Sequence, residues 1–296
     1  MSCGIVLQSI RQRDASVKQD SSQMQPGLYI VATPIGSLRD MTLRALDTLK
    51  AADLILCEDT RVTAKLLSHY GIRKPTLSYN DHNGKERRPK IMAMLQEGKC
   101  LALVSDAGTP LISDPGYKLA REVVERGFYI TALPGASSVL AGLCLSGLPT
   151  DRFFFAGFLP AKKEACRKEV AALAAVPATL IFFESARRLP ETLALLNEGL
   201  GNRPAAVARE LTKLYEETRR GALQELQAHY EKTGAPKGEV VIVIAPPEKA
   251  AISDADIETK LRFLLVSHSV KEAATILAEQ TGRPRKEIYA LALKLK

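Results

Sequence analysis

Short apolar runs alternate with longer amphipathic stretches over the first half of the chain. Strands buried on both faces are expected where the chain is apolar almost throughout, at 28–32, 53–57, 101–104 and 129–133. Helices are expected where apolar side chains recur every three or four positions, at 42–51, 62–70, 85–97, 115–126 and 134–145. This alternation predicts a parallel sheet with helices on both faces, and so an α/β domain.

The pattern changes near residues 148–151, where a second set of elements begins. Its strands are expected at 153–158, 179–183, 205–208 and 238–245, with helices beginning at Lys162 and Gly221. Pro246-Pro247 ends this set, because two prolines cannot continue a central strand. Beyond it the chain has no strand signal, and helices are expected at 256–267, 270–280 and 285–296. The Gly-containing turn at 281–284 gives the last two a helix-turn-helix-like pattern.

We therefore predict an α/β protein with a two-domain fold and a small C-terminal helical domain. The expected parts are a flexible tail at 1–26, an N-terminal α/β domain at 27–148, a C-terminal α/β domain at 149–247 and a helical domain at 251–296. A length of 296 residues suits two domains that each bury a core.

Composition narrows the class of partner and the compartment. The net charge of +8 favours an anionic partner, with nucleic acid foremost, although aromatic residues at 5% disfavour stacking on many bases. The five cysteines lack a C-x-x-C pair, and Cys57, Cys100 and Cys144 lie in apolar runs as expected buried thiols, which suits the cytoplasm. Neither they nor the four scattered histidines have metal-ligand spacing, so no metal is expected. We expect no signal peptide and no membrane span.

The segment Val104–Gly116 is the strongest chemical signal. It follows an expected strand and holds two glycines, two prolines and two aspartates, Asp106 and Asp114. The ends of strands are where open α/β sheets hold ligands, so a ligand-binding turn is favoured over a solvated loop. Unusual loops also follow other expected strands, at 33–36, 58–61, 134–138, 183–185 and 209–212. If these loops emerge on one side, they form a cleft between the two α/β domains.

Six separated motifs carry a resemblance to a known family. They are T-P-I-G-S-L-R-D-M-T at 33–42, C-E-D-T-R at 57–61, S-D-A-G-T-P-L-I-S-D-P-G at 105–116, L-P-G-A-S-S at 133–138, F-A-G-F-L-P at 155–160 and F-E-S-A-R-R-L at 183–189. Together they resemble the tetrapyrrole-methylase superfamily, over roughly residues 27–245. Within it they look like the branch that methylates the ribose 2′-oxygen of cytidine 1402 in bacterial 16S ribosomal RNA, which also carries a helical C-terminal region.

The resemblance implies S-adenosylmethionine as methyl donor, held between two α/β domains of a homodimer. It implies donor contacts by the residues of this chain that match the family's pocket: Pro34, Ser105, Asp106, Ala107, Gly108, Ser137, Ser138, Phe183, Glu184, Ala208 and Gly238. Helix capping is the alternative role for the two serines. Asp106 is expected on the donor side, whereas Asp114 is equally suited to cap the following helix. Tetrapyrrole-acting members have Gly-Asp-Pro where this chain has Ser105-Asp106-Ala107, which favours the RNA branch.

A ribose hydroxyl is a poor nucleophile, so a general base would assist methyl transfer. Glu184 and Asp59 are the candidate bases, with Glu58 and Glu210 behind them. The alternative for three of these is an ion pair with an arginine nearby in sequence: Asp59 with Arg61, Glu184 with Arg187, and Glu210 with Arg209. The residues alone do not single out the base.

Basic clusters suit an RNA acceptor. The candidate RNA-binding residues are Arg61, Lys85, Arg87, Arg88, Lys162, Lys163, Arg283, Arg285 and Lys286. Each cluster alone is also typical of a solvated face. The substrate is left open between free 16S RNA and the 30S subunit. The alternative functions are a methyltransferase of the same fold acting on a small molecule such as a tetrapyrrole, and an RNA-binding assembly factor without catalysis. A nicotinamide oxidoreductase is disfavoured, since no G-x-G-x-x-G follows the first strand.

Overall fold

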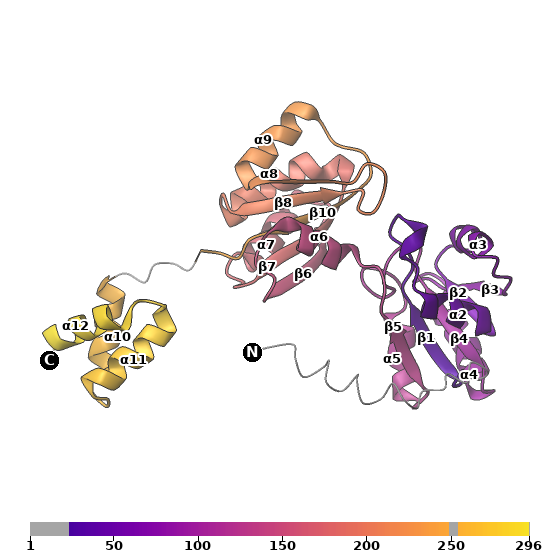
Figure 1. Ribbon diagram of the computed structural model, residues 1–296, viewed down its shortest axis with the longest axis horizontal. Helices are drawn as coiled ribbons and strands as arrows, with labels where there is room; N and C mark the ends of the chain where they lie inside the picture. The colour runs from indigo at the N-terminus through magenta and orange to yellow at the C-terminus, as the bar shows by residue number, and fades with distance from the viewer. Residues whose placement is uncertain (1–23, 249–253, 296) are drawn as a thin grey trace. The chain divides into compact units, whose positions relative to one another are not determined.

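The computed structural model describes residues 24–248 and 254–295 (Figure 1). The chain divides into two compact units, Met1–Pro246 and Pro247–Lys296. Most of the predicted N-terminal tail, residues 1–23, lies outside the described residues. The first unit holds two five-stranded sheets, and we call the parts built on them the first lobe (residues 24–137) and the second lobe (residues 138–246).

The first lobe is a parallel sheet of strand order β3-β2-β4-β1-β5. Its strands are β1 (Gly27–Val31), β2 (Leu54–Cys57), β3 (Thr76–Ser78), β4 (Cys100–Val104) and β5 (Ile130–Leu133). Its helices are η1 (Leu38–Asp40), α2 (Leu43–Ala51), α3 (Thr60–His69), α4 (Gly84–Gln96) and α5 (Tyr117–Glu125). The strands and helices predicted for this lobe are confirmed, whereas η1 and β3 had not been predicted. Strand β3 has three half-buried residues, which are too few to form an apolar run.

Helices cover both faces of the first sheet, as the uninterrupted apolar strands predict. On one face α2 and α3 pack through Leu49 and Leu67 against side chains such as Ile55. On the other face α4 and α5 pack through Ile91 and Leu119. Because all five strands are parallel, their carboxyl ends share one edge of the sheet, and the loops that follow them meet there.

The second lobe is a mixed sheet of order β6-β7-β10-β8-β9. Its strands are β6 (Phe153–Phe158), β7 (Thr179–Ser185), β8 (Pro204–Arg209), β9 (Glu217–Ala222) and β10 (Glu239–Ile244). Its helices are α6 (Ser138–Ser146), α7 (Lys163–Leu173), η2 (Ala186–Arg188), α8 (Leu189–Leu200) and α9 (Leu223–Thr233). Strand β10 runs antiparallel between β7 and β8, so it begins at the edge where those two strands end.

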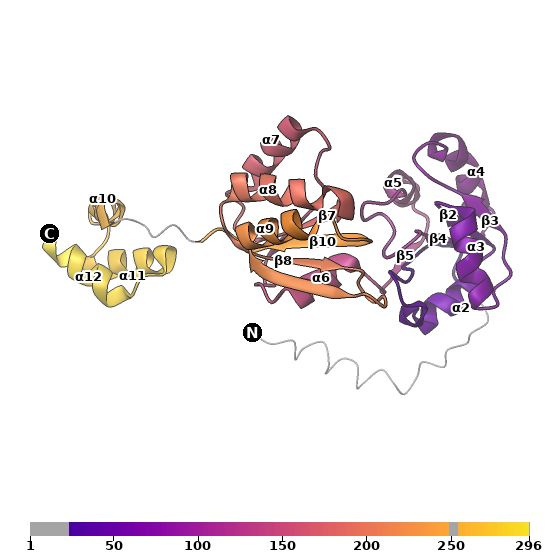
Figure 2. The ribbon, with the colours of Figure 1, turned by 90° about the horizontal axis from the view of Figure 1, so that it is seen from above.

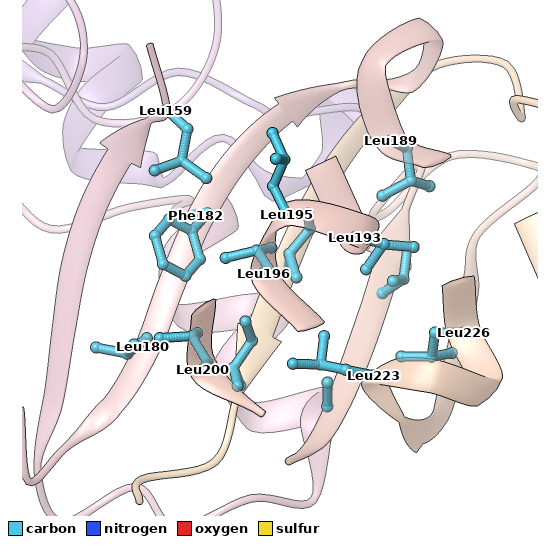
Figure 3. Packing of buried hydrophobic residues seen from close by; sticks show 14 of the residues in the cluster. Leu159, Leu180, Phe182, Leu189, Leu193, Leu195, Leu196, Leu200, Leu223 and Leu226 are labelled. Carbon is cyan, nitrogen blue, oxygen red and sulfur yellow. The ribbon is translucent and has the colours of Figure 1, made fainter. Parts of the chain in front are cut away.

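The second sheet is buried on both faces by helices (Figure 2). Helices α7, α8 and α9 cover one face, where Phe182 lies among leucines of the sheet and of α8 and α9, including Leu196 and Leu223 (Figure 3). Helix α6 covers the other face, although it precedes residue 148 in sequence. Its Val139 and Leu143 pack on the sheet, and Gly142 lets it approach Val241 closely.

Several features of the second lobe differ from the sequence analysis. Helix α8 and strand β9 had not been predicted; β9, E-T-R-R-G-A, is polar because it is an edge strand that pairs only with β8. Cys144 was expected to be buried and is exposed, because it lies on the side of α6 that faces away from the sheet. Cys57 and Cys100 are buried as predicted.

The C-terminal unit is a three-helix bundle with its own core. Its helices are α10 (Asp254–Leu264), α11 (Val270–Thr281) and α12 (Arg285–Lys294), close to the predicted spans. Ser269 starts α11 with a capping box, accepting a hydrogen bond from the backbone N–H of Glu272, and Gly282 ends the helix in the left-handed region. Ile257, Leu277 and Ile288 contribute one buried side chain from each helix. Among the described helices, none is long and apolar enough to cross a membrane.

Candidate active site

A cavity of about 450 Å³ lies where the strand-end loops of the two lobes meet. This is the size and position expected of a small-molecule site in an α/β protein. The first lobe contributes Ile35 and the segments 106–109 and 112–114. The start of α6 contributes 137–139, and the rest of the second lobe contributes Phe158, Leu211 and the segments 183–186 and 238–241.

Backbone pairing fixes the 105–108 loop that lines the cavity. Thr33 and Gly108 exchange two backbone hydrogen bonds of 2.9 and 3.0 Å, which tie the end of β1 to the turn after β4. The buried Ser105 hydroxyl donates to the Gly108 carbonyl at 3.1 Å, and the Thr33 hydroxyl donates to the Ser105 carbonyl at the same distance. Gly108 has a φ of 81°, which favours glycine. The loop therefore presents Asp106 and Ala107 from a rigid base.

The amino end of α6 opens into the cavity. Ser137 is the N-cap of this helix and accepts a hydrogen bond from the backbone N–H of Leu140 at 3.4 Å. The capping role considered for the serines is confirmed for Ser137, and both serines also line the cavity. The partial positive charge of a helix amino end favours an anionic group such as a carboxylate here.

Glu184 is held inside the second lobe by a complete set of partners. Its carboxylate accepts hydrogen bonds from the Thr192 hydroxyl at 2.6 Å and from the Ser185 backbone N–H at 2.7 Å. The Arg188 guanidinium lies 3.7 Å away, and the Glu184 side chain is 1% exposed. These contacts favour a structural role for its carboxylate, which joins the end of β7 to α8. The alternative considered for Glu184, an ion pair with Arg187, has the wrong partner, because the turn η2 brings Arg188 toward Glu184 instead.

A second network joins the lobes at the rim of the cavity. The Lys213 ammonium lies 3.0 Å from the carboxylates of both Glu210 and Glu239. Thr212 accepts a hydrogen bond from the backbone N–H of Ser37 at 3.0 Å, so this loop reaches the first lobe. The hydrogen bond from Lys213 lowers the pKa of Glu210. The predicted pair of Glu210 with Arg209 is wrong.

Arg209 pairs elsewhere because of strand pairing. Its guanidinium bonds Glu217 at 2.8 Å, since the two residues face each other across the β8–β9 pair. That contact lowers the pKa of Glu217.

The first lobe brings several carboxylates together without cations. Burial, followed by the negative charges of Glu58 and Asp106, raises the pKa of Asp114 to about 6. Burial and the charge of Asp106 raise the pKa of Glu58, and burial also raises the pKa of Asp106. Asp114 does not cap α5, since the N-cap is Gly116. It lines the cavity instead.

Asp59 has the opposite environment, although it follows the neighbouring strand β2. The pair predicted with Arg61 is confirmed at 2.6 Å, and Asp59 also caps α3 by accepting from the Arg61 backbone N–H at 2.8 Å. Hydrogen bonds from Arg61 lower the pKa of Asp59 to about 2. Its side chain is outside the cavity lining, but its backbone N–H donates to Asp106 at 3.3 Å and orients that carboxylate.

Most of the expected donor-binding residues lie on the cavity wall. The lining includes Asp106, Ala107, Gly108, Ser137, Ser138, Phe183, Glu184 and Gly238. Three others lie behind it: Pro34 is buried next to the lining residue Ile35, Ser105 holds the loop, and Ala208 is buried in the sheet. The sequence reasoning missed Phe158, Leu211, Glu239 and the lining role of Asp114. The F-A-G-F motif was a signal for Phe158, because a bulge between Phe155 and Gly157 breaks the strand just before it.

The expected RNA-binding residues differ in how freely they are exposed. Arg88 is partly buried and pairs with Glu122 of α5 at 3.2 Å, which gives it a structural role in the first lobe. Lys163 pairs with Glu191, and Arg283 lies 3.4 Å from Glu287. The Arg61 side chain is 86% exposed beside its partner Asp59. Lys85, Lys162, Arg285 and Lys286 are exposed, and Arg87 is partly exposed.

The lining suits a donor that combines a cation, an amino acid group and a purine. Its titratable residues are all acidic, its apolar wall includes Ile35, Val139 and Leu211, and the α6 amino end suits a carboxylate. Among the described residues, no group of three or more His, Cys, Asp or Glu side chains is arranged to hold a metal ion.

Known proteins are similar to this chain over almost its whole length. Residues 27–227 match the family model of tetrapyrrole (corrin/porphyrin) methylases, and residues 251–296 match that of the RsmI C-terminal HTH domain. A ribosomal RNA small subunit methyltransferase I of Mesorhizobium japonicum is 51% identical over 92% of this chain and 93% of its own length. The proteins of that name in Erythrobacter litoralis and Escherichia coli O157:H7 are 53% and 43% identical, over 92% and 93% of this chain and 96% and 98% of their own lengths.

Solved structures share the fold at lower identity. A uroporphyrin-III C-methyltransferase of Thermus thermophilus, complexed with S-adenyl homocysteine, is 21% identical with a TM-score of 0.51, over 73% of this chain and 96% of its own. A diphthine synthase is 17% identical with a TM-score of 0.58, over 74% of this chain and 89% of its own.

Proposed function

The chain belongs to the tetrapyrrole (corrin/porphyrin) methylase family, and on that premise we propose that it is an S-adenosylmethionine-dependent methyltransferase of small-subunit ribosomal RNA. We propose further that the acceptor is the ribose 2′-oxygen of a cytidine, cytidine 1402 of 16S RNA. The observation that carries the proposal is the cavity at the strand-end loops, in a chain that aligns over almost its whole length with ribosomal RNA methyltransferases.

The residues of the cavity have distinct tasks in this function. When bound, S-adenosylmethionine supplies a methyl group on a positively charged sulfur. Asp106 offers a carboxylate to the cationic part of the donor, and the Ser137 end of α6 offers N–H groups to its carboxylate. The apolar wall around Val139 and Leu211 accommodates the purine. Transfer from a sulfonium mainly requires alignment of donor and acceptor, which a rigid loop such as 105–108 provides.

Two further observations favour RNA over a small acceptor. The alignment with the ribosomal RNA methyltransferase of Mesorhizobium japonicum spans 92% of this chain, whereas the alignment with the solved uroporphyrin methyltransferase spans 73% of it. The C-terminal unit, which matches the HTH model, presents the exposed Arg285 and Lys286 at the start of α12. Exposed cations of this kind bind phosphates regardless of sequence, and their binding weakens with salt.

We also propose that the protein acts in the cytoplasm as a homodimer. Support for the dimer comes from β6, an edge strand with exposed Phe153 and Phe154. An apolar strand edge of this kind favours association. Light scattering on purified protein should give twice the chain mass of 32.2 kDa.

The test of the proposed function is transfer of labelled methyl groups by the purified protein. Free 16S RNA and 30S subunits from cells lacking the enzyme are compared as acceptors, and the product is mapped for ribose methylation. The expected result is one labelled cytidine ribose. Label on a base, or none on either acceptor in the presence of bound donor, would contradict the proposal. A parallel reaction with a tetrapyrrole as acceptor tests the small-molecule alternative, which predicts label on the tetrapyrrole and none on RNA.

Removal of the C-terminal unit tests its role in the same assay. A chain ending at Pro246 keeps the entire cavity lining. We expect its affinity for RNA to fall about tenfold or more as several phosphate contacts are lost, with donor affinity unchanged. An equal loss of both affinities would show that the unit acts on stability.

A further inference from the structure

The cavity has an unusual set of titratable groups. Its lining contains four, Asp106, Asp114, Glu184 and Glu239, and no histidine, lysine, arginine, tyrosine or cysteine is found among the described lining residues. A side-chain proton acceptor drawn from this lining is therefore one of the four carboxylates. The environments of the four differ enough to separate them.

Three of the four are committed to other partners. Glu184 accepts from Thr192 and Ser185, and its side chain is almost completely buried. Glu239 is 77% exposed and is paired with Lys213. Asp106 accepts a hydrogen bond from the backbone N–H of Asp59, and it is the carboxylate assigned to the donor. Glu184 and Glu239 are thus neutralised by cations, and Asp106 is assigned to the donor.

Asp114 is different in position and in partners. It is partly buried at the cavity wall, and the charged groups that face it are Glu58 from the end of β2 and Asp106 from the loop after β4, both acidic. Ser105 is its neutral hydrogen-bonding neighbour. Burial, together with the negative charges of Glu58 and Asp106, raises the pKa of Asp114 to about 6, which lies near the working range of a general base.

The backbone around Asp114 is held in a demanding conformation. Leu111 and Ser113 have φ angles of 74° and 63°, in the left-handed region that non-glycine residues rarely adopt. Leu111 packs on the core of the first lobe beneath the loop, which secures this conformation. Strained residues of this kind concentrate where a side chain must be aimed at a ligand. Here this backbone conformation places residues 112–114 in the wall of the cavity.

We propose that Asp114 is the catalytic base that accepts the proton of the acceptor hydroxyl. In the step, the O–H bond of the ribose 2′-hydroxyl breaks and its proton passes to the Asp114 carboxylate. A bond forms between that oxygen and the methyl carbon, while the carbon–sulfur bond breaks and leaves its electron pair on sulfur. The proton is released to water afterwards. This inference rests on the proposed function.

The test compares Asp114→Asn with the wild-type protein in single-turnover methylation of 30S subunits at saturating donor. Asparagine keeps the shape of the side chain and cannot take the proton. We expect the rate to fall by at least about 100-fold, with donor affinity measured by calorimetry changed less than about threefold. The wild-type rate should rise with pH to a plateau above an apparent pKa of about 6, and the variant should lose this titration.

Two further variants complete the test. Asp114→Glu keeps a carboxylate and should regain part of the rate, and Asp47→Asn removes an exposed carboxylate from α2 and should match the wild type. An unchanged rate in Asp114→Asn would overturn the inference, as would a rate loss that higher donor concentration restores. If Asp114→Asn does not fold, a wild-type rate that is flat from pH 5 to 8 would overturn it. A wild-type protein that binds donor and never methylates RNA would instead refute the proposed function.

Discussion

Apart from Asp59, which pairs with Arg61, the carboxylates at the strand ends have opposite environments in the two lobes. At the edge of the first lobe, Glu58, Asp106 and Asp114 lie together, and none of them forms an ion pair with a described residue. Their pKa values are raised. At the edge of the second lobe, Glu184 has Arg188, and Glu210 and Glu239 share Lys213. The second lobe is neutralised from within, whereas the first lobe retains charge that a ligand can neutralise.

The difference indicates a division of labour. A carboxylate that is already paired stabilises the fold and has little to offer a ligand. Clustered carboxylates without cations cost the folded protein stability, and perturbed groups of this kind mark functional sites. On this basis, substitutions in the second lobe should affect stability first. Substitutions in the first lobe should affect donor binding and chemistry first.

The largest effect on stability is expected from Glu184→Ala. Removal of this buried carboxylate leaves Thr192 and Arg188 without their partner, so the free energy of unfolding should fall by about 3 kcal/mol. Urea denaturation measures the loss. Glu239→Ala is the control on the same edge, because its carboxylate is exposed and should contribute less than about 1 kcal/mol. If both variants lost similar free energies of unfolding, burial of the carboxylate would not determine its contribution to stability.

The next largest effect is expected from Asp106→Ala, on donor affinity. Loss of a charge-assisted contact should weaken binding by roughly 10- to 100-fold in calorimetry. Asp81→Ala removes a negative charge that also acts on Glu58 but does not line the cavity. It should change affinity less than about twofold. If the two variants weaken binding equally, total charge rather than contact governs donor binding.

Asp114→Asn should make the protein more stable at pH 8 than the wild type. The folded pKa of about 6 lies above the unfolded value near 3.9, so the wild type loses stability as pH rises through this interval. The variant avoids that loss and should gain about 1–2 kcal/mol at pH 8, with little gain at pH 4. Thermal denaturation at the two pH values measures it. A variant less stable than the wild type at pH 8 would show that the ionised carboxylate has a favourable partner.

The smallest effect is expected from Phe158→Ala, on RNA. The Phe158 ring is 58% exposed at the cavity and lies edge-to-face with Phe183 at 5.5 Å, so it offers a surface on which a base can stack. Loss of the ring should raise the KM for 30S subunits by roughly fivefold. Phe158→Tyr keeps the ring and should keep the KM. A change in donor affinity instead would place this ring against the donor.

The first lobe could be predicted almost completely from its sequence, whereas the second could not. Uninterrupted apolar strands reveal a parallel sheet, and only the short elements η1 and β3 escaped prediction. In the second lobe β9 is polar, and β10 runs antiparallel in the middle of the sheet, which its apolar sequence does not reveal. The strand-end loops nevertheless meet as expected, because β10 begins where β7 and β8 end.

The site was predictable in its motifs and not in its pairings. Asp106 and Ser137 stand out by residue type and position, and Gly238 was implied by the family resemblance. The structure brings all three to one cavity. Which cation meets which carboxylate depends on turns of a few residues. The turn η2 gives Glu184 the guanidinium of Arg188 instead of Arg187, and strand pairing gives Arg209 to Glu217. Asp114 resembled a helix cap in sequence, and only the backbone of residues 111–113 turns it toward the cavity.

The acidic lining of the cavity also discriminates between the charged and the uncharged parts of an RNA strand. Asp106 and Asp114, the two cavity carboxylates without an ion pair to a described residue, repel phosphates. Exposed cations that attract phosphates, such as Lys85 and Lys162, are not among the lining residues. A ribose and its base carry no charge, so they can enter where the backbone cannot. In the proposed function, an RNA strand held by its phosphates outside the cavity would present a nucleoside, and not its backbone, to the interior. Higher salt should weaken the binding of phosphates to the exposed cations. It should also ease the entry of the nucleoside, because salt screens the repulsion between the cavity carboxylates and the neighbouring phosphates.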